Sequence, residues 1–119
     1  MAFSLGLTLY ALGARPEGVQ LAPPPRPGGA LVWLHAPEGA LAPMTELARR
    51  LIEEDGVSVL LTCGGAPATE ALVQPPPLEF AADVVAFLDH WRPDVAVMGG
   101  GELRPMLLHQ AARRGLAVF

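Results

Sequence analysis

Several residue types are scarce or missing in this chain of 119 residues. It has no lysine, which we attribute to genome composition bias, and its eight basic residues are all arginine. Its formal net charge is −4, so no basic field exists to attract a phosphate backbone, and nucleic acid is not expected as a partner. The single cysteine, Cys63, excludes an intrachain disulfide and fits a reducing compartment.

Long apolar runs and nucleotide-binding motifs are also missing. No stretch of about 18 apolar residues occurs, so no segment is long enough to span a membrane. Residues 3–14 are apolar but short and lack a basic n-region, and they form a poor signal peptide. They are predicted to be a short helix that either contacts a bilayer surface or docks on the protein. Neither GxGxxG nor a P-loop is present, and the histidines are too dispersed for a metal site with Cys63, so no cofactor or metal is predicted.

What the chain has in abundance is apolar residues. They make up 51% of the sequence against 17% charged residues, which is enough for the core of one domain and leaves apolar surface for a partner. We expect two parts: a helix and a Pro/Gly-rich connector over residues 1–29, and a folded body over residues 30–119. Residues 15–29 contain five prolines and three glycines, which predicts an extended connector between a mobile arm and that body.

From residue 30 onward, short apolar runs alternate with amphipathic stretches. The runs predict strands at 30–35, 57–62, 95–98 and 116–119, and a short one at 78–80. Apolar spacings of three and four predict helices at 43–54, 81–91 and 103–114, with another starting over 67–73. This alternation predicts an α/β fold, a three-layer Rossmann-like parallel sheet with helices on both faces. Because the chain stops inside a buried strand, we expect a fragment of a longer protein.

Three loops are expected to meet at the carboxyl edge of this sheet, where open α/β sheets bind ligands. Glycine follows the strand in each loop, and the next helix N-terminus offers N–H groups to an anion. The alternative is that glycine only satisfies tight turns. The predicted ligand-binding residues are His35, Gly39, Cys63, Gly64, Gly65, Gly99, Gly100, Gly101, Glu102 and Arg104. Among them Arg104, in the first turn of a helix, is the best candidate for contacting a phosphate.

Glu38 and Glu102 stand at or just before helices at this edge. A carboxylate there complements the helix dipole, which is worth about 0.3–1 kcal/mol. The alternative for Glu38 is a general base, which needs an acceptor hydroxyl within hydrogen-bond reach. His35 either holds that carboxylate, binds substrate, or is a hydrogen-bonded structural histidine. The two tryptophans, Trp33 and Trp91, are predicted to be core aromatics.

Five segments together resemble a known family, the N-terminal domain of 3-deoxy-D-manno-octulosonic acid (Kdo) transferases. They are VWLHA (32–36), VLLT with its glycine loop (59–65), PLE (77–79), FLDHWRPDVAV (87–97) and ELRP (102–105). The resemblance implies one half of a glycosyltransferase-B fold, which receives a lipid A precursor as acceptor. It also implies a C-terminal domain that binds CMP-Kdo, inverting transfer in the cleft between the domains, and a cytoplasmic location peripheral to the inner membrane. Without that second domain the chain is expected to be inactive.

The resemblance makes Glu38 the catalytic base, because the family's base is a glutamate shortly after the HA of an HA-x-S-x-G-E motif. This chain reads HAPEG, so the match requires a deletion, and the motif's serine and glycine are missing. Gly100 and Gly101 replace the acidic residue before the family's E-L-W-P, and Arg104 replaces its tryptophan. Two interpretations stay open: a divergent transferase with another acceptor, or a degenerate, non-catalytic module that binds a ligand or forms a homodimer.

Overall fold

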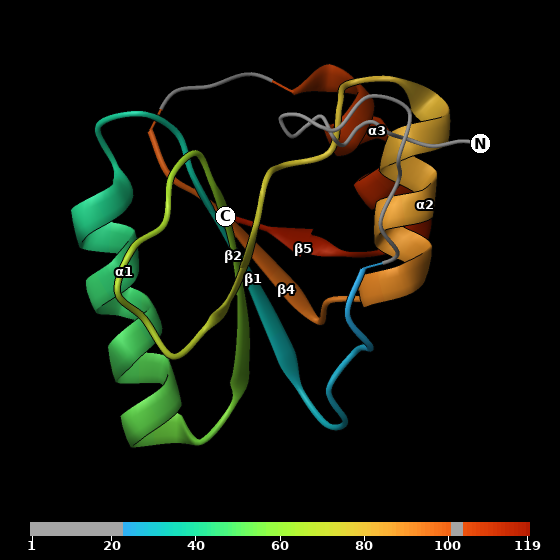
Figure 1. Ribbon diagram of the computed structural model, residues 1–119. Coiled ribbons are helices and arrows are strands. Elements are labelled where there is room, and N and C mark those ends of the chain that lie inside the picture. The colour runs from blue at the N-terminus through green and yellow to red at the C-terminus, as the bar shows by residue number, and fades with distance from the viewer. Residues whose placement is uncertain (1–22, 101–103) are drawn as a thin grey trace.

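The computed structural model describes residues 23–100 and 104–119, and within them five parallel strands form one sheet in the order β3-β2-β1-β4-β5 (Figure 1). The strands are β1 (Leu31–Ala36), β2 (Ser58–Cys63), β3 (Leu72–Gln74), β4 (Val95–Met98) and β5 (Ala117–Val118). The helices are α1 (Leu41–Arg50), a π-helical turn η1 (Leu51–Asp55), α2 (Ala81–Trp91) and α3 (Pro105–Arg114). Helix α1 lies on one face of the sheet, and α2 and α3 lie on the other. The predicted α/β fold is confirmed.

The core consists of two apolar clusters, one on each face of the sheet. Successive residues of a strand point to opposite faces, so β1 places Trp33 under α2 and α3 and Leu34 under α1. The cluster under α2 and α3 contains both tryptophans, each 1% exposed, which confirms their prediction as core aromatics. Trp33 also packs against Phe87, with 4.6 Å between ring centroids. The cluster under α1 includes Met44, Ala48, Leu61 and Cys63.

The segment between β2 and α2 differs from its prediction. Residues 67–73 do not start a helix, and the third strand is Leu72–Gln74 rather than residues 78–80. Nucleating a helix is costly in so short a stretch between prolines, and the Thr69 hydroxyl accepts a hydrogen bond from the Ala71 backbone N–H (3.1 Å), a turn that competes with a helix. The prolines at 75–77 cannot donate ladder hydrogen bonds, so pairing with β2 is made by the residues before them.

The other boundaries shift by one or two residues. Helix α1 begins at Leu41, two residues earlier than predicted, and continues as η1 to Asp55. Helix α2 and strand β4 have the predicted bounds. Arg92 takes a left-handed conformation with φ +42°, so it leaves the right-handed α region as predicted, although a residue before proline usually becomes extended. Residues 1–22 and 101–103 lie outside the described part of the chain, and with them the helix predicted at 3–14, most of the connector, and the start of the helix predicted at 103.

Arg26, near the end of the connector, forms hydrogen bonds with the folded body. Its Nε donates to the Trp91 carbonyl at 2.6 Å and its Nη2 to the Arg92 carbonyl at 3.0 Å. These carbonyls end α2, where a helix leaves acceptors unpaired and a cation is favoured. Nη2 also lies 3.7 Å from Asp94 Oδ2, which accepts the Leu31 backbone N–H at 2.8 Å. Arg26 therefore ties together the connector, the end of α2 and the first residues of β1 and β4.

Candidate functional site

The candidate site follows from a reversal in the order of the strands. Strands β2 and β3 lie on one side of β1. After α2 the chain crosses to the other side of β1, where β4 and β5 lie. In open α/β sheets, the crevice outside the carboxyl ends of two such strands is the usual place for a ligand. Here the loops after β1 and β4 meet at that crevice, and the Gly99 backbone N–H donates to the His35 carbonyl at 2.9 Å.

Gly99 and Gly100 are accounted for by the close contact of these two loops. A Cβ atom on Gly99 would lie 3.2 Å from the His35 carbonyl oxygen and 3.3 Å from the Met44 side chain. Gly100 has φ +71°, and its Cβ would lie 3.0 Å from Pro37 Cγ. Both positions therefore favour glycine for steric and conformational reasons. A ligand is not needed to explain these residues, and their predicted role in binding stays a prediction.

Glu38 stands at the tip of the loop after β1. It is exposed, as is the following Gly39, and within the described residues its carboxylate makes no hydrogen bond or ion pair. A carboxylate in this position is hydrated and able to accept a proton from a hydroxyl group bound at the crevice. The position of Glu38 is thus compatible with the predicted role as general base, although no group of the described residues forms a hydrogen bond or ion pair with its carboxylate.

His35 lies below the two loops, in a row of buried polar side chains. Its Nδ1 is 2.9 Å from Thr62 Oγ1, which also accepts a hydrogen bond from Trp33 Nε1 at 2.9 Å. All three residues are at most 2% exposed. Of the roles considered for His35, this contact supports the hydrogen-bonded structural histidine. Thr62 was not predicted from the sequence, where its only signal is a hydroxyl near the end of an apolar strand.

The loop after β2 contributes to the same edge, but its cysteine faces the other side of the sheet. Cys63 is 3% exposed and packs in the cluster under α1, and burial raises the pKa of its thiol. Gly64 and Gly65 are exposed and, with Pro75 and Pro76, line a cavity of about 440 Å³ between the ends of β2 and β3. Cys63 also lines this cavity, so the predicted binding roles of Cys63, Gly64 and Gly65 stay predictions.

The N-terminus of α3 is capped by a residue from a distant part of the chain. Glu79 accepts the backbone N–H groups of Met106 (2.9 Å, to Oε1) and Leu107 (3.1 Å, to Oε2). Arg104 Nη1 donates to the Pro77 carbonyl at 2.8 Å. The carboxylate satisfies two orphan helix donors and complements the dipole, so Glu79 holds the position predicted for a ligand anion.

We expect Glu79→Ala to lower the free energy of unfolding by about 1–2 kcal/mol, the upper part of the range for a lost helix cap. The variant leaves two backbone donors of α3 without their partner. Urea denaturation followed by circular dichroism measures the change. Glu54→Ala is the matched control, because Glu54 is an exposed glutamate that makes one 3.3 Å ion pair with Arg50. Equal effects of the two variants would contradict the capping role.

These features define a Rossmann-like α/β domain with its candidate site at the carboxyl ends of β1, β2 and β4. The sequence model of one family, described as 3-deoxy-D-manno-octulosonic-acid transferase (kdotransferase), matches residues 12–119. The chain belongs to this family, as an N-terminal glycosyltransferase domain, which confirms the resemblance of its segments. No curated protein and no solved structure matched the chain.

Two further observations concern the described residues alone. They contain no group of three or more His, Cys, Asp or Glu side chains arranged to hold a metal ion. None of their helices is long and apolar enough to cross a membrane. Gly101 and Glu102, both predicted at the ligand edge, lie outside the described residues, so their roles stay predictions.

Proposed function

We propose that this chain is the acceptor-binding domain of a Kdo transferase, which moves Kdo from CMP-Kdo to a lipid A precursor. The proposal is supported by the family match over residues 12–119, together with an exposed carboxylate, Glu38, in the loop that follows the central strand β1. CMP-Kdo would bind to a C-terminal domain facing this edge of the sheet. We place the protein in the cytoplasm, peripheral to the inner membrane, where a lipid acceptor is accessible.

In the proposed reaction, Glu38 accepts the proton of an acceptor hydroxyl as that oxygen attacks the anomeric carbon of Kdo. A new carbon–oxygen bond forms, the bond from the anomeric carbon to the phosphate oxygen breaks, and CMP leaves with the electron pair. Attack from the face opposite to CMP inverts the anomeric centre. General-base assistance of this kind contributes a factor of about 10²–10⁴ to a rate.

The departures from the family motif favour a second candidate. Gly100 has a left-handed backbone conformation where the family carries an acidic side chain, and Glu79 holds the N-terminus of α3. A domain with these features could bind the acceptor without supporting transfer. This second candidate is a non-catalytic binding module.

One experiment separates these functions. The purified chain is titrated with the lipid A precursor, and labelled CMP-Kdo is then added with and without the C-terminal donor domain of a Kdo transferase. We expect saturable binding of the precursor, and labelled product only when the donor domain is present. Binding without product in either reaction would support the non-catalytic module. Absence of binding and of product would reject both functions.

A further inference from the structure

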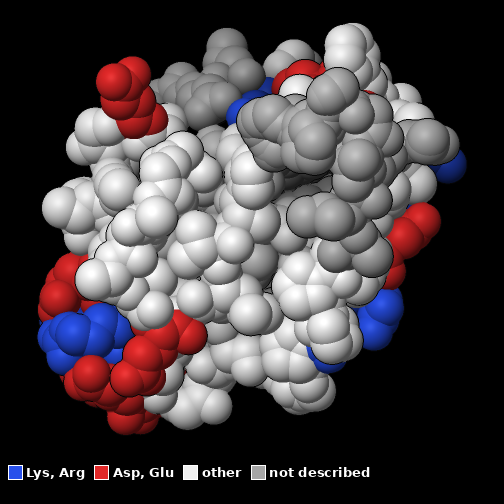
Figure 2. All heavy atoms as spheres, in the orientation of Figure 1, with Lys and Arg blue, Asp and Glu red and all other residues white. Residues whose placement is uncertain are grey.

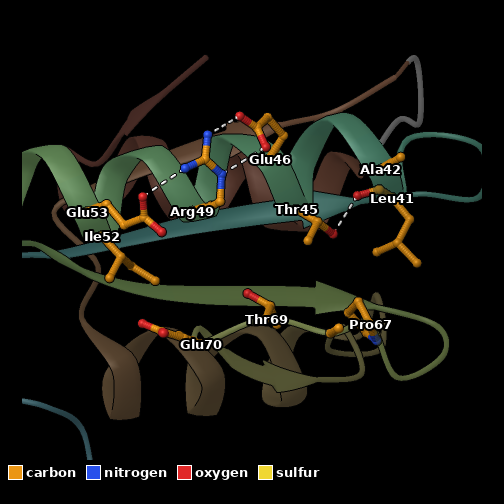
Figure 3. Close-up of a pocket in the computed structure, with 11 residues that line it drawn as sticks. Leu41, Ala42, Thr45, Glu46, Arg49, Ile52, Glu53, Pro67, Thr69 and Glu70 are labelled. Carbon is orange, nitrogen blue, oxygen red and sulfur yellow. Dashed lines mark hydrogen bonds and ion pairs between the residues drawn. The ribbon is translucent and has the colours of Figure 1, made fainter.

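A groove of about 840 Å³ runs along one flank of α1, and it shares only Pro67 with the cavity between the ends of β2 and β3. One wall is formed by α1 and η1, from Leu41 to Glu53, and the other by residues 67–70, which precede β3 (Figure 3). The side chains of Leu41 and Ile52 point from the helical wall toward the opposite segment, with Thr45 between them.

The groove exists because the connection from β2 to β3 has no helix. Neighbouring parallel strands are usually joined by a crossover of about a dozen residues or more, most often helical. Here residues 64–71 make the connection, and their only secondary structure is a set of bends. The flank of α1 that a crossover helix would cover is therefore bordered by one irregular segment, and its apolar side chains stay accessible.

The groove has an apolar lining and an acidic rim. Besides the apolar side chains, it is lined by three glutamates, Glu46, Glu53 and Glu70, and by one arginine, Arg49. Arg49 is engaged on both sides, since it donates to Glu46 Oε2 at 2.5 Å and to Glu53 Oε1 at 2.8 Å. The hydrogen bond from Arg49 lowers the pKa of Glu46, so this carboxylate stays ionised. The rim is therefore negatively charged overall.

The surrounding surface agrees with this picture. Figure 2 shows charged side chains gathered at one corner of this face, with largely uncharged surface next to them. Across from the α1 wall, Ala68 and Glu70 are exposed on the segment before β3, and Pro67 is half-buried. An apolar strip flanked by carboxylates complements a ligand that has an apolar stripe and basic flanks.

We propose that this groove binds an amphipathic helix of a protein partner, with Leu-type side chains on one stripe and arginines beside it. Leu41 and Ile52 are eleven residues apart on the helical wall, which corresponds to about 16 Å, or about three turns of a bound helix. Such a helix anchors through side chains at i, i+3, i+4 and i+7, the spacing used in helix-in-groove recognition. The proposal concerns a surface outside the catalytic edge and does not depend on the proposed function.

The test uses a synthetic peptide of twelve residues with leucines at helical spacing and flanking arginines, and a twin in which glutamates replace the arginines. Fluorescence anisotropy with the intact chain is expected to show saturable binding of the basic peptide, weakened by added salt, and binding of the acidic twin at least about tenfold weaker. Ala68→Lys and Glu70→Lys, both at exposed positions of the groove wall, should each weaken the basic peptide by about fivefold to tenfold.

The control is Ala86→Lys, which adds the same charge as Ala68→Lys at an exposed position of α2 outside the groove and should leave binding unchanged. Circular dichroism verifies that each variant folds. Shifts of the backbone NMR signals of Thr45 and Thr69 on binding would support the proposal. It would be overturned by equal affinity for the acidic twin, by unchanged affinity in both groove variants, by NMR shifts confined to another surface, or by absence of saturable binding.

Discussion

Replacing Trp33 with alanine is expected to lower the free energy of unfolding by about 3–5 kcal/mol, the range for removing a large aromatic side chain from a core. Trp33 lies at the centre of the sheet, is 1% exposed, and packs against Phe87. Its loss leaves a cavity beneath α2 and also removes the indole N–H that Thr62 accepts. Natural domains have only about 5–15 kcal/mol of stability, so the variant would lose a large fraction of its stability.

The control for this prediction is Trp33→Phe, which keeps an aromatic ring and removes the hydrogen bond to Thr62. We expect a loss of about 1–2 kcal/mol, since the Thr62 hydroxyl then lacks one partner and the smaller ring fills less space. Urea titration followed by the fluorescence of the remaining tryptophan, Trp91, measures both variants. A loss below about 1 kcal/mol for Trp33→Ala would contradict the central position of this residue in the core.

Glu38→Gln is expected to reduce Kdo transfer by about 10²–10⁴-fold in the reaction with the donor domain, because an amide cannot accept the proton of the acceptor hydroxyl. The loss should appear in kcat, with the affinity for the lipid A precursor nearly unchanged, since the amide keeps the size and most of the polarity of the carboxylate. Glu38 is exposed and unpaired within the described residues, so stability should not change.

Glu54→Gln is the matched control for this variant. Glu54 is also an exposed glutamate, but it lies on η1, away from the loops that meet after β1 and β4. The control should transfer Kdo at the unaltered rate. Unchanged transfer by Glu38→Gln would remove Glu38 as the base.

Local patterns were sufficient to predict most of the elements. The apolar runs of β1, β2 and β4 and the spacing of α2 come from residues close together in the sequence, and these predictions are within one residue of the structure. The helix over residues 67–73 and the strand over residues 78–80 were predicted wrongly because the conformation of this part of the chain depends on distant partners. Leu72 pairs with Leu60 in β2, and Glu79 reaches across to α3, and neither contact leaves a periodic signal in the sequence.

The candidate site was predictable to a similar degree. The order of strands and helices was sufficient to place the glycine loops at one edge, and the resemblance to Kdo transferases pointed to Glu38. The contacts of Thr62 with Trp33 and His35 join residues 29 and 27 positions apart, so no local pattern reveals them. The cap of α3 by Glu79 was likewise missed, although PLE, which contains Glu79, and ELRP, which directly precedes Met106 and Leu107, were both part of the resemblance.

The contacts of Arg26 offer a way to calibrate mutational work on this domain. They join the end of α2 to the starts of β1 and β4, at the amino ends of the strands, whereas Glu38 and the glycine loops lie beyond the carboxyl ends. A graded series of substitutions at Arg26, from lysine to alanine, is therefore expected to lower the stability of the fold and to leave the surroundings of Glu38 unchanged. For that series, a plot of the Kdo transfer rate against the free energy of unfolding gives the effect of lost stability alone. A variant near Glu38 affects the reaction itself when its transfer rate departs from that line.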